Sequence, residues 1–129
     1  MKPSNIDVIE RHYAAGAKGE PAGMVADFAD DVRWTEAAGT ELAGTYVGSQ
    51  AVIENVFAAI AYTWNDFRVE VDELHADDDV VFSLGTYRAV HGKTGEPLDA
   101  RFVHVWRLTD GRIVQFEQIV DSAMFPRTR

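Results

Sequence analysis

The sequence predicts a mixed α+β fold, because helical patterns fill its first half and strand patterns fill its second half. Up to residue 64, apolar residues mostly recur every three or four positions, as on the buried face of a helix. From Phe67 onward, apolar and polar residues alternate, and polar turns separate the alternating segments. This order indicates α+β architecture, with helices on one face of a curved antiparallel sheet.

The first helix is predicted to follow Ser4, which can cap it, with the acidic Asp7 three positions later. Glycines and a proline in residues 16–21 end this helix. A second, short helix is expected over residues 22–28. The buried stripe of the first helix is expected to comprise Ile6, Ile9 and Tyr13.

A strand is expected next, after Asp30 and Asp31, with Val32, Trp34 and Glu36 on one face. Residues 37–48 contain three glycines and predict a loop or an irregular hairpin. Ser49 is then expected to cap the longest helix, over residues 50–64. Its apolar stripe consists of Val52, Ile53, Val56, Phe57, Ile60 and Trp64.

Four strand segments complete the chain and predict a meander of neighbouring antiparallel strands. They cover residues 67–72, 80–90, 98–108 and 113–120. The last turn contains Asp110-Gly111, a pair typical of tight hairpins. In the third segment, one face carries aromatic rings and an imidazole, while the other mixes valines with arginines. The mixed face predicts a homodimer through the open side of the sheet.

Composition excludes several classes of function. The chain has 129 residues, enough for one domain, and 47% of them are apolar. It has no cysteine, which excludes disulfides and zinc–thiolate sites, and its histidines lack metal-binding spacings. The net charge of −9 and the scattered basic residues argue against nucleic-acid and membrane partners. No secretion signal or membrane span is evident, so a cytoplasmic location is expected.

Several short motifs occur in the order known from one superfamily. They are FADDVRWTE at residues 28–36, GTYVG at residues 44–48 before a helix, and FVHVWRL at residues 102–108 before an Asp-Gly hairpin. Asp121 follows that hairpin. Over nearly its whole length the chain resembles ketosteroid isomerases and SnoaL-like polyketide cyclases of the nuclear-transport-factor-2-like superfamily. The resemblance implies one cone-shaped, cystatin-like domain over residues 1–129, with three N-terminal helices and an apolar pocket.

The resemblance also carries a catalytic pattern onto this chain, with substitutions. The isomerase base, an aspartate, falls on Glu36, and its oxyanion-binding tyrosine falls on His12, beside Tyr13. The protonated aspartate of that family falls on His104. The substitutions imply chemistry different from that of a standard steroid isomerase.

Two other reactions of the superfamily have residues of the required type here. The acid that cyclases place late in the sheet corresponds to Asp121. The epoxide hydrolases use an Asp-Arg-Asp set, for which Asp99, Arg101 and Asp121 have the right types, although Arg101 is expected to point away from the pocket.

Glu36, His104 and Asp121 are therefore the candidate catalytic residues. Burial beside Val32 and Trp34 would raise the pKa of Glu36 toward the range of a general base. His104 would donate to an oxyanion or pair with Glu36; a core histidine is the alternative. Asp121 is either catalytic or a strand-end cap, and needs a bulge to point inward. The candidate substrate-binding residues are His12, Tyr13, Trp34, Tyr46, Phe57, Trp64, Phe102, Trp106 and Gln118; Tyr87 is a further aromatic of the expected wall.

Two functions fit these residues. The first is an enzyme without cofactor or metal that moves a proton on a small apolar carbonyl or polycyclic compound. Isomerisation, cyclisation and dehydration all share that step. The second is a non-catalytic module of the same fold that binds a small ligand or a protein.

Overall fold

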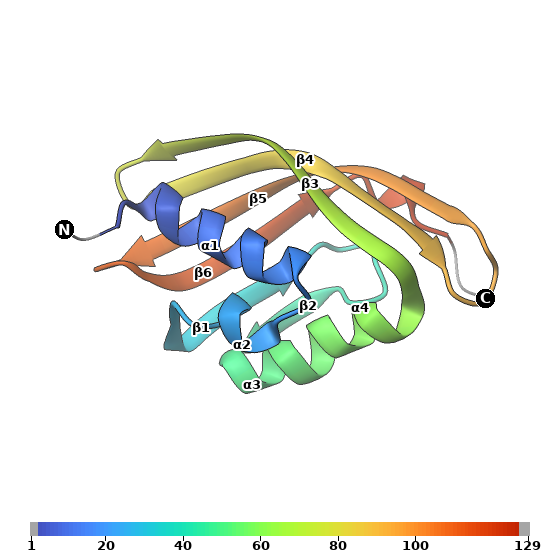
Figure 1. Cartoon of the computed structure of the whole chain (residues 1–129), viewed down its shortest axis with the longest axis horizontal. Helices are drawn as coiled ribbons and strands as arrows, with labels where there is room; N and C mark the ends of the chain where they lie inside the picture. Colours follow the sequence, from blue (N-terminus) through green and yellow to red (C-terminus); the bar gives the residue numbers. More distant parts are fainter. Residues whose placement is uncertain (1–2, 127–129) are drawn as a thin grey trace.

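One curved, six-stranded sheet arches over the helices in the computed structural model (Figure 1). The structure describes residues 3–126, so both ends of the predicted 1–129 domain lie outside the described residues. Helices cover one side of the sheet only, as the sequence predicts for an α+β fold. The strands are β1 (Phe28–Glu36), β2 (Gly44–Val47), β3 (Trp64–Asp77), β4 (Val80–His91), β5 (Pro97–Thr109) and β6 (Arg112–Val120).

The strand order is β2-β1-β6-β5-β4-β3. The predicted meander of β3 to β6 is confirmed, with antiparallel pairing between successive strands. β1 joins it by parallel pairing with β6, which places Trp34 beside Phe116. β2 pairs with β1 in an antiparallel hairpin, so the hairpin alternative predicted for residues 37–48 is confirmed. This connection brings the end of β1 close to the end of β6.

The first helix, α1, spans Asn5–Ala17 and begins with the predicted capping box between Ser4 and Asp7. The second helix is shorter than predicted: α2 spans only Pro21–Met24. The prediction of helix up to residue 28 is wrong because Phe28 already pairs with Ile113 of β6 and is buried. β1 therefore begins before the aspartates of residues 30 and 31, and its pairing shifts register across them.

The long predicted helix is continuous but not uniform. It consists of α3 (Ser49–Val52), the π-helical turn η1 (Ile53–Phe57) and α4 (Ala58–Thr63). Gly48, not Ser49, occupies the N-cap position, and Trp64 begins β3 instead of ending the helix. The wider turn inserts an extra residue, which rotates the stripe after it. Val52 before the turn and Val56 within it are fully buried, while Phe57 at its end and Ile60 beyond it are only partly buried.

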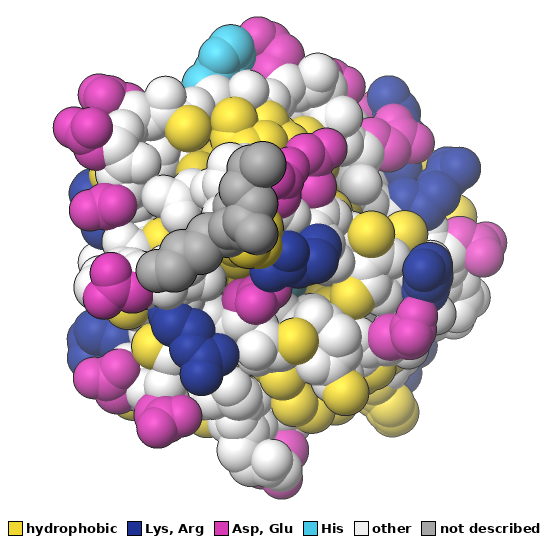
Figure 2. Space-filling model, turned by 60° about the vertical axis from the view of Figure 1, so that its left-hand side comes forward, with side chains coloured by type: hydrophobic (Ala, Val, Ile, Leu, Met, Phe, Trp, Pro, Cys, Tyr) yellow, Lys and Arg dark blue, Asp and Glu magenta, His cyan; other side chains and the backbone are white. Residues whose placement is uncertain are grey.

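Two packed clusters of side chains fill the interior. The larger lies between α1, α3 and the sheet and includes the fully buried Trp106 and Phe116. The smaller lies at the other end, around Tyr87 and Phe102. Gly85 leaves room for the Phe102 ring and for strand β3, because a Cβ there would lie 2.6 Å from that ring and 2.2 Å from a β3 carbonyl oxygen. Outside, acidic and basic side chains are interspersed on the face seen in Figure 2.

Candidate active site

A cavity of about 1170 Å³ lies between the helices and the concave side of the sheet. Its size suits a small organic molecule, and its wall is mostly apolar with a few polar groups. Strands β1, β4, β5 and β6 supply its deepest polar side chains, and α1 and α4 cover them. The predicted site residues that line it are His12, Tyr13, Trp34, Glu36, Phe57, Trp64, His104 and Gln118.

Asp121 does not reach this cavity. It is exposed at the start of the short helix η2 (Ser122–Met124), and its backbone N–H donates to the Arg101 carbonyl at 3.0 Å. A bulge near the end of β6 would be needed to turn its side chain inward. The register shift between β5 and β6 lies instead at Arg107 and Leu108, at the other end of the strands.

Three predicted substrate-binding aromatics lie behind the cavity wall instead of on it. The Tyr46 hydroxyl donates to the Leu42 carbonyl at 2.8 Å. Phe102 stacks on the His104 ring with centroids 4.0 Å apart. Trp106 is fully buried, and its indole N–H is shared between the Tyr13 and Ser83 hydroxyls. These residues hold the lining side chains in position.

Glu36 is the buried carboxyl group of the cavity, because Glu41 and Glu70 also line it but are exposed and half-buried. It ends β1 and is only 6% exposed. The indole N–H of Trp34, on the same strand face, donates to its Oε2 atom at 2.8 Å. Burial raises the pKa of Glu36 to about 7, and hydrogen bonds from Trp34 and Gln118 limit the rise. This carboxyl group therefore gains or loses its proton near neutral pH, a range that suits a general base.

The raised pKa of Glu36 predicts a pH-dependent stability. Between the ordinary pKa of 4.5 and about 7, the folded chain holds a proton at Glu36 that the unfolded chain has released. The free energy of unfolding should therefore fall by about 3 kcal/mol from this group as the pH rises through that window. Urea unfolding of wild type and Glu36→Gln at several pH values measures it. The variant should gain stability relative to wild type as pH rises, and a pH-independent difference contradicts the prediction.

His104 occupies the centre of a hydrogen-bonded chain. Its Nδ1 atom lies 2.6 Å from the Tyr13 hydroxyl of α1, and its Nε2 atom is hydrogen-bonded to the Tyr87 hydroxyl of β4. Burial, and then the nearby His12, lower the pKa of His104 well below its ordinary value, so the ring is neutral. The His104 ring lines the cavity, but both of its nitrogens are engaged, so its polar atoms can act on a ligand only through the two tyrosine hydroxyls.

The hydrogen-bonded chain of Tyr13, His104 and Tyr87 contains one hydrogen atom more than its two hydrogen bonds use. Each of the two phenols and the neutral imidazole carries one, and the two contacts use two of these three. With Nδ1 protonated, the spare O–H belongs to Tyr13. With Nε2 protonated, it belongs to Tyr87. Moving protons along the chain therefore exchanges the two states without changing its charge.

Gln118 lies between the hydrogen-bonded chain of His104 and the carboxyl group of Glu36. It lies directly opposite His104 in the β5–β6 pair. Its Oε1 atom accepts from the Ala37 backbone N–H at 3.0 Å, and its Nε2 donates to the Tyr87 oxygen at 2.9 Å. Gln118 also lies beside Glu36 and helps to lower the pKa of that carboxyl group. The carboxyl group of Glu36 and the hydroxyl of Tyr87 are therefore neighbours across one amide.

His12 and Tyr13 both reach the cavity, although Tyr13 alone was expected to complete the buried stripe of α1. His12 is the more buried, together with Val8 and Ile9. Its Nδ1 atom lies 2.9 Å from the Met24 carbonyl oxygen. Burial lowers the pKa of His12 to about 4 against the opposing effect of that carbonyl, so this ring is also neutral.

The hydroxyl of Tyr87 is the polar group that sequence reasoning missed. The sequence predicts its ring as part of the cavity wall but predicts no catalytic role for its oxygen. The signal lies in the register of β4 and β5, which pairs small residues with large ones: Ser83 with His104 and Gly85 with Phe102. Tyr87 shares this strand face. The position of the turn at residues 91–95 would have fixed that register.

Neither a metal site nor a membrane-spanning helix is found in the described part of the chain. Among residues 3–126, no group of three His, Asp or Glu side chains is placed to hold a metal ion. Within the same residues, no helix has the length and apolar character needed to cross a membrane.

Comparisons with known proteins agree with this architecture. Residues 9–116 match the family described as the SnoaL-like domain. An NTF2-like protein of Burkholderia thailandensis is 36% identical over 95% of both chains, with a TM-score of 0.92. An NTF2-like protein of unknown function from Burkholderia pseudomallei is 31% identical over 95% of this chain and 94% of the other, with a TM-score of 0.87.

A third similar structure carries a ligand. This structure is TerC co-crystallised with polyporic acid. The TerC chain is 26% identical to this chain over 92% of both chains, with a TM-score of 0.83. No curated protein matches the sequence. These similarities confirm the cone-shaped, cystatin-like fold predicted from the motifs.

Proposed function

Because the chain belongs to the SnoaL-like family of the NTF2-like fold, we propose that it is a cofactor-independent enzyme that moves a proton next to a carbonyl group. The observation that supports this most is the pairing of a buried carboxyl group, Glu36, with the Tyr87 hydroxyl in one apolar cavity. A base and a donor to the carbonyl oxygen are the groups that the reaction needs.

Glu36 is the proposed general base. Its carboxylate takes the proton from the carbon beside the carbonyl, and the electron pair of that C–H bond moves onto the carbonyl oxygen to form an enolate. A pKa of about 7 suits this role, because the carboxylate is then both available and basic at neutral pH. The Trp34 N–H fixes the orientation of the carboxyl group.

Tyr87 is the proposed donor to the enolate oxygen. In the state with Nε2 of His104 protonated, the Tyr87 oxygen accepts from His104 and Gln118, and its own O–H is free for the substrate. A preorganised donor of this kind stabilises negative charge that develops in the transition state. Tyr13 donates to His104 in that state, so the hydrogen bonds from Tyr13 through His104 strengthen the Tyr87 hydroxyl as a donor.

The proposed substrate is a small, largely apolar carbonyl or polycyclic compound. Aromatic and aliphatic side chains make up most of the cavity wall, which favours such a compound. The similar TerC structure with polyporic acid supports the choice of a small organic ligand. Isomerisation, cyclisation and dehydration remain within the proposal, because all begin with the same proton removal.

Proton exchange tests the proposal without knowledge of the natural substrate. Bicyclic ketones such as 1-tetralone are incubated in D₂O with the protein, and the loss of the signal of the protons beside the carbonyl is followed by ¹H NMR. Protein-dependent exchange supports the enzyme. A panel of ketones that raises the melting temperature but shows neither exchange nor product would indicate a binding module instead.

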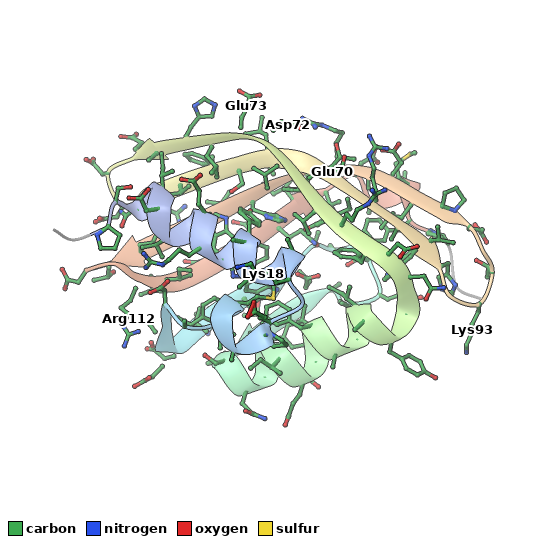
Figure 3. The ribbon with its side chains drawn as sticks, viewed as in Figure 1. Lys18, Glu70, Asp72, Glu73, Lys93 and Arg112 are labelled. Atoms are coloured by element: carbon green, nitrogen blue, oxygen red, sulfur yellow. The ribbon has the colours of Figure 1, made fainter. Side chains whose placement is uncertain are left out.

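We also propose that the chain forms a homodimer through the outer face of the sheet. The outer apolar strip consists of Phe82, Leu84, Val103, Val105 and Ile119, which are neighbours through the β4–β5 and β5–β6 registers. Phe82 is 37% exposed and Ile119 is 53% exposed. One charge beside the strip is already paired: Arg101 bonds Asp72 at 2.6 Å, and Asp72 points away from the helices (Figure 3).

A charged residue in the strip should therefore prevent dimerisation. Ile119→Lys is expected to turn a dimer into a monomer in analytical ultracentrifugation, because two lysines would be buried against apolar side chains. Tyr62→Lys on α4 is the matched control, since Tyr62 is 84% exposed and lies off the sheet. Wild type sedimenting as a monomer at high concentration would end this proposal.

A further inference from the structure

One nitrogen of His12 is unused by the mechanism proposed above. The contact of Nδ1 with the Met24 carbonyl, at 2.9 Å, fixes the tautomer, because a carbonyl oxygen can only accept a hydrogen bond. Nδ1 therefore carries the hydrogen of this neutral ring. The other nitrogen, Nε2, is left with a bare lone pair and can only accept.

This lone pair faces the cavity. No side-chain or backbone group of the described residues donates to Nε2, although the His12 side chain belongs to a residue only 5% exposed. Among those same residues, every buried side-chain nitrogen or oxygen that is sealed from open space has a partner. Nε2 is therefore not sealed, and the open space that His12 lines is the cavity.

The aromatic rings around His12 provide no hydrogen-bond donor for Nε2. The ring packs against Trp106, Trp34 and Phe28, with centroids 4.8, 5.8 and 6.0 Å away. None of these rings offers a donor to Nε2, since the Trp106 and Trp34 N–H groups are bonded elsewhere. An apolar ligand that covered Nε2 would displace water and leave the lone pair unpaired, which is unfavourable.

We propose that Nε2 of His12 accepts a hydrogen bond from a hydroxyl group of the ligand, so that the substrates are hydroxylated cyclic carbonyl compounds instead of plain ketones. The carbonyl part rests on the proposed function, whereas the hydroxyl part rests on His12 alone. The cavity then offers complementary groups at two points: a donor at Tyr87 and an acceptor at His12. A neutral hydroxyl fits better than an ammonium group, because a full charge loses its hydration in this apolar wall.

Calorimetric titration with ligands that lack a carbonyl tests the hydroxyl part separately. We expect wild type to bind 2-naphthol about five- to tenfold more tightly than 2-methoxynaphthalene, as one added hydrogen bond allows. In His12→Phe, which keeps a flat ring, the two affinities should become equal within about twofold. Glu41→Gln, at an exposed residue that borders the cavity, should keep the preference. Retention of the preference in His12→Phe, or its absence in wild type, would overturn the proposal.

A measurement on wild type tests the same hydrogen bond without relying on the folding of the His12→Phe variant. The ¹⁵N signal of the His12 Nε2 nitrogen should move toward that of a hydrogen-bonded nitrogen when 2-naphthol is added and stay in place with 2-methoxynaphthalene. An unchanged signal with bound 2-naphthol would overturn the proposal. Because neither ligand can undergo the carbonyl reaction, this result is independent of proton exchange: absence of exchange refutes the enzyme, and absence of the shift refutes the role of His12.

Discussion

Replacing Glu36 by Gln should slow proton exchange by a factor of about 10² to 10⁴, the usual contribution of a general base. The amide has the shape of the carboxyl group, and its oxygen can still accept from the Trp34 N–H. The cavity and its affinity for a ketone should therefore change little. Steady-state exchange rates with 1-tetralone should show the loss in kcat, while KM stays within about threefold.

Glu41→Gln is the matched control for that substitution. Glu41 also borders the cavity, but its side chain is exposed. The same chemical change there should leave the exchange rate within about twofold of wild type, as is usual for a surface position. Equal rates for wild type and Glu36→Gln would remove Glu36 from the mechanism and favour a ligand-binding role for the cavity.

The pH profile of wild type should identify the same group. The base acts as a carboxylate, so kcat/KM should rise with pH and level off above the pKa of Glu36, which is about 7. A solvated glutamate would place this limb near its ordinary value of 4.5. The rate rises over the same pH range in which burial of the ionising carboxyl group lowers stability, because both effects come from one ionisation.

The elements that depend on local patterns were predictable from the sequence. Alternation in β5 placed Phe102 and His104 on the inner face, and the capping box at Ser4 located the start of α1. The inward position of Glu36 followed from its alternation with Val32 and Trp34. These predictions succeed because the pattern and the structure share one period, two residues in a strand and about 3.6 in a helix.

The partners of His104 were not predictable in this way. Tyr13 comes from α1 and Tyr87 from β4, and both reach one imidazole only because α1 crosses the sheet at a particular angle. That angle is set by packing of the whole interior, not by spacing in the sequence. Asp121 illustrates the opposite error: its residue type fits a catalytic acid, but without a local bulge its side chain stays outside.

Tyr87→Phe should lower kcat by a factor of about 10² to 10³, the loss expected when one donor to a developing oxyanion is removed. The ring remains and keeps its stacking on Phe102, with centroids 4.4 Å apart in wild type. Exchange of the protons of 1-tetralone measures the effect. Tyr46→Phe is the control, because Tyr46 does not line the cavity and its hydroxyl is bonded to the Leu42 carbonyl.

Tyr13→Phe separates the two states of the hydrogen-bonded chain. Tyr13 stands one imidazole away from the proposed donor, so its loss should weaken the chain but leave the Tyr87 O–H in place. The expected decrease in kcat is therefore smaller than that of Tyr87→Phe, about tenfold. If Tyr13→Phe were the slower variant, the spare hydrogen would act from Tyr13, and the substrate oxygen would have to bind beside α1 instead of beside Gln118.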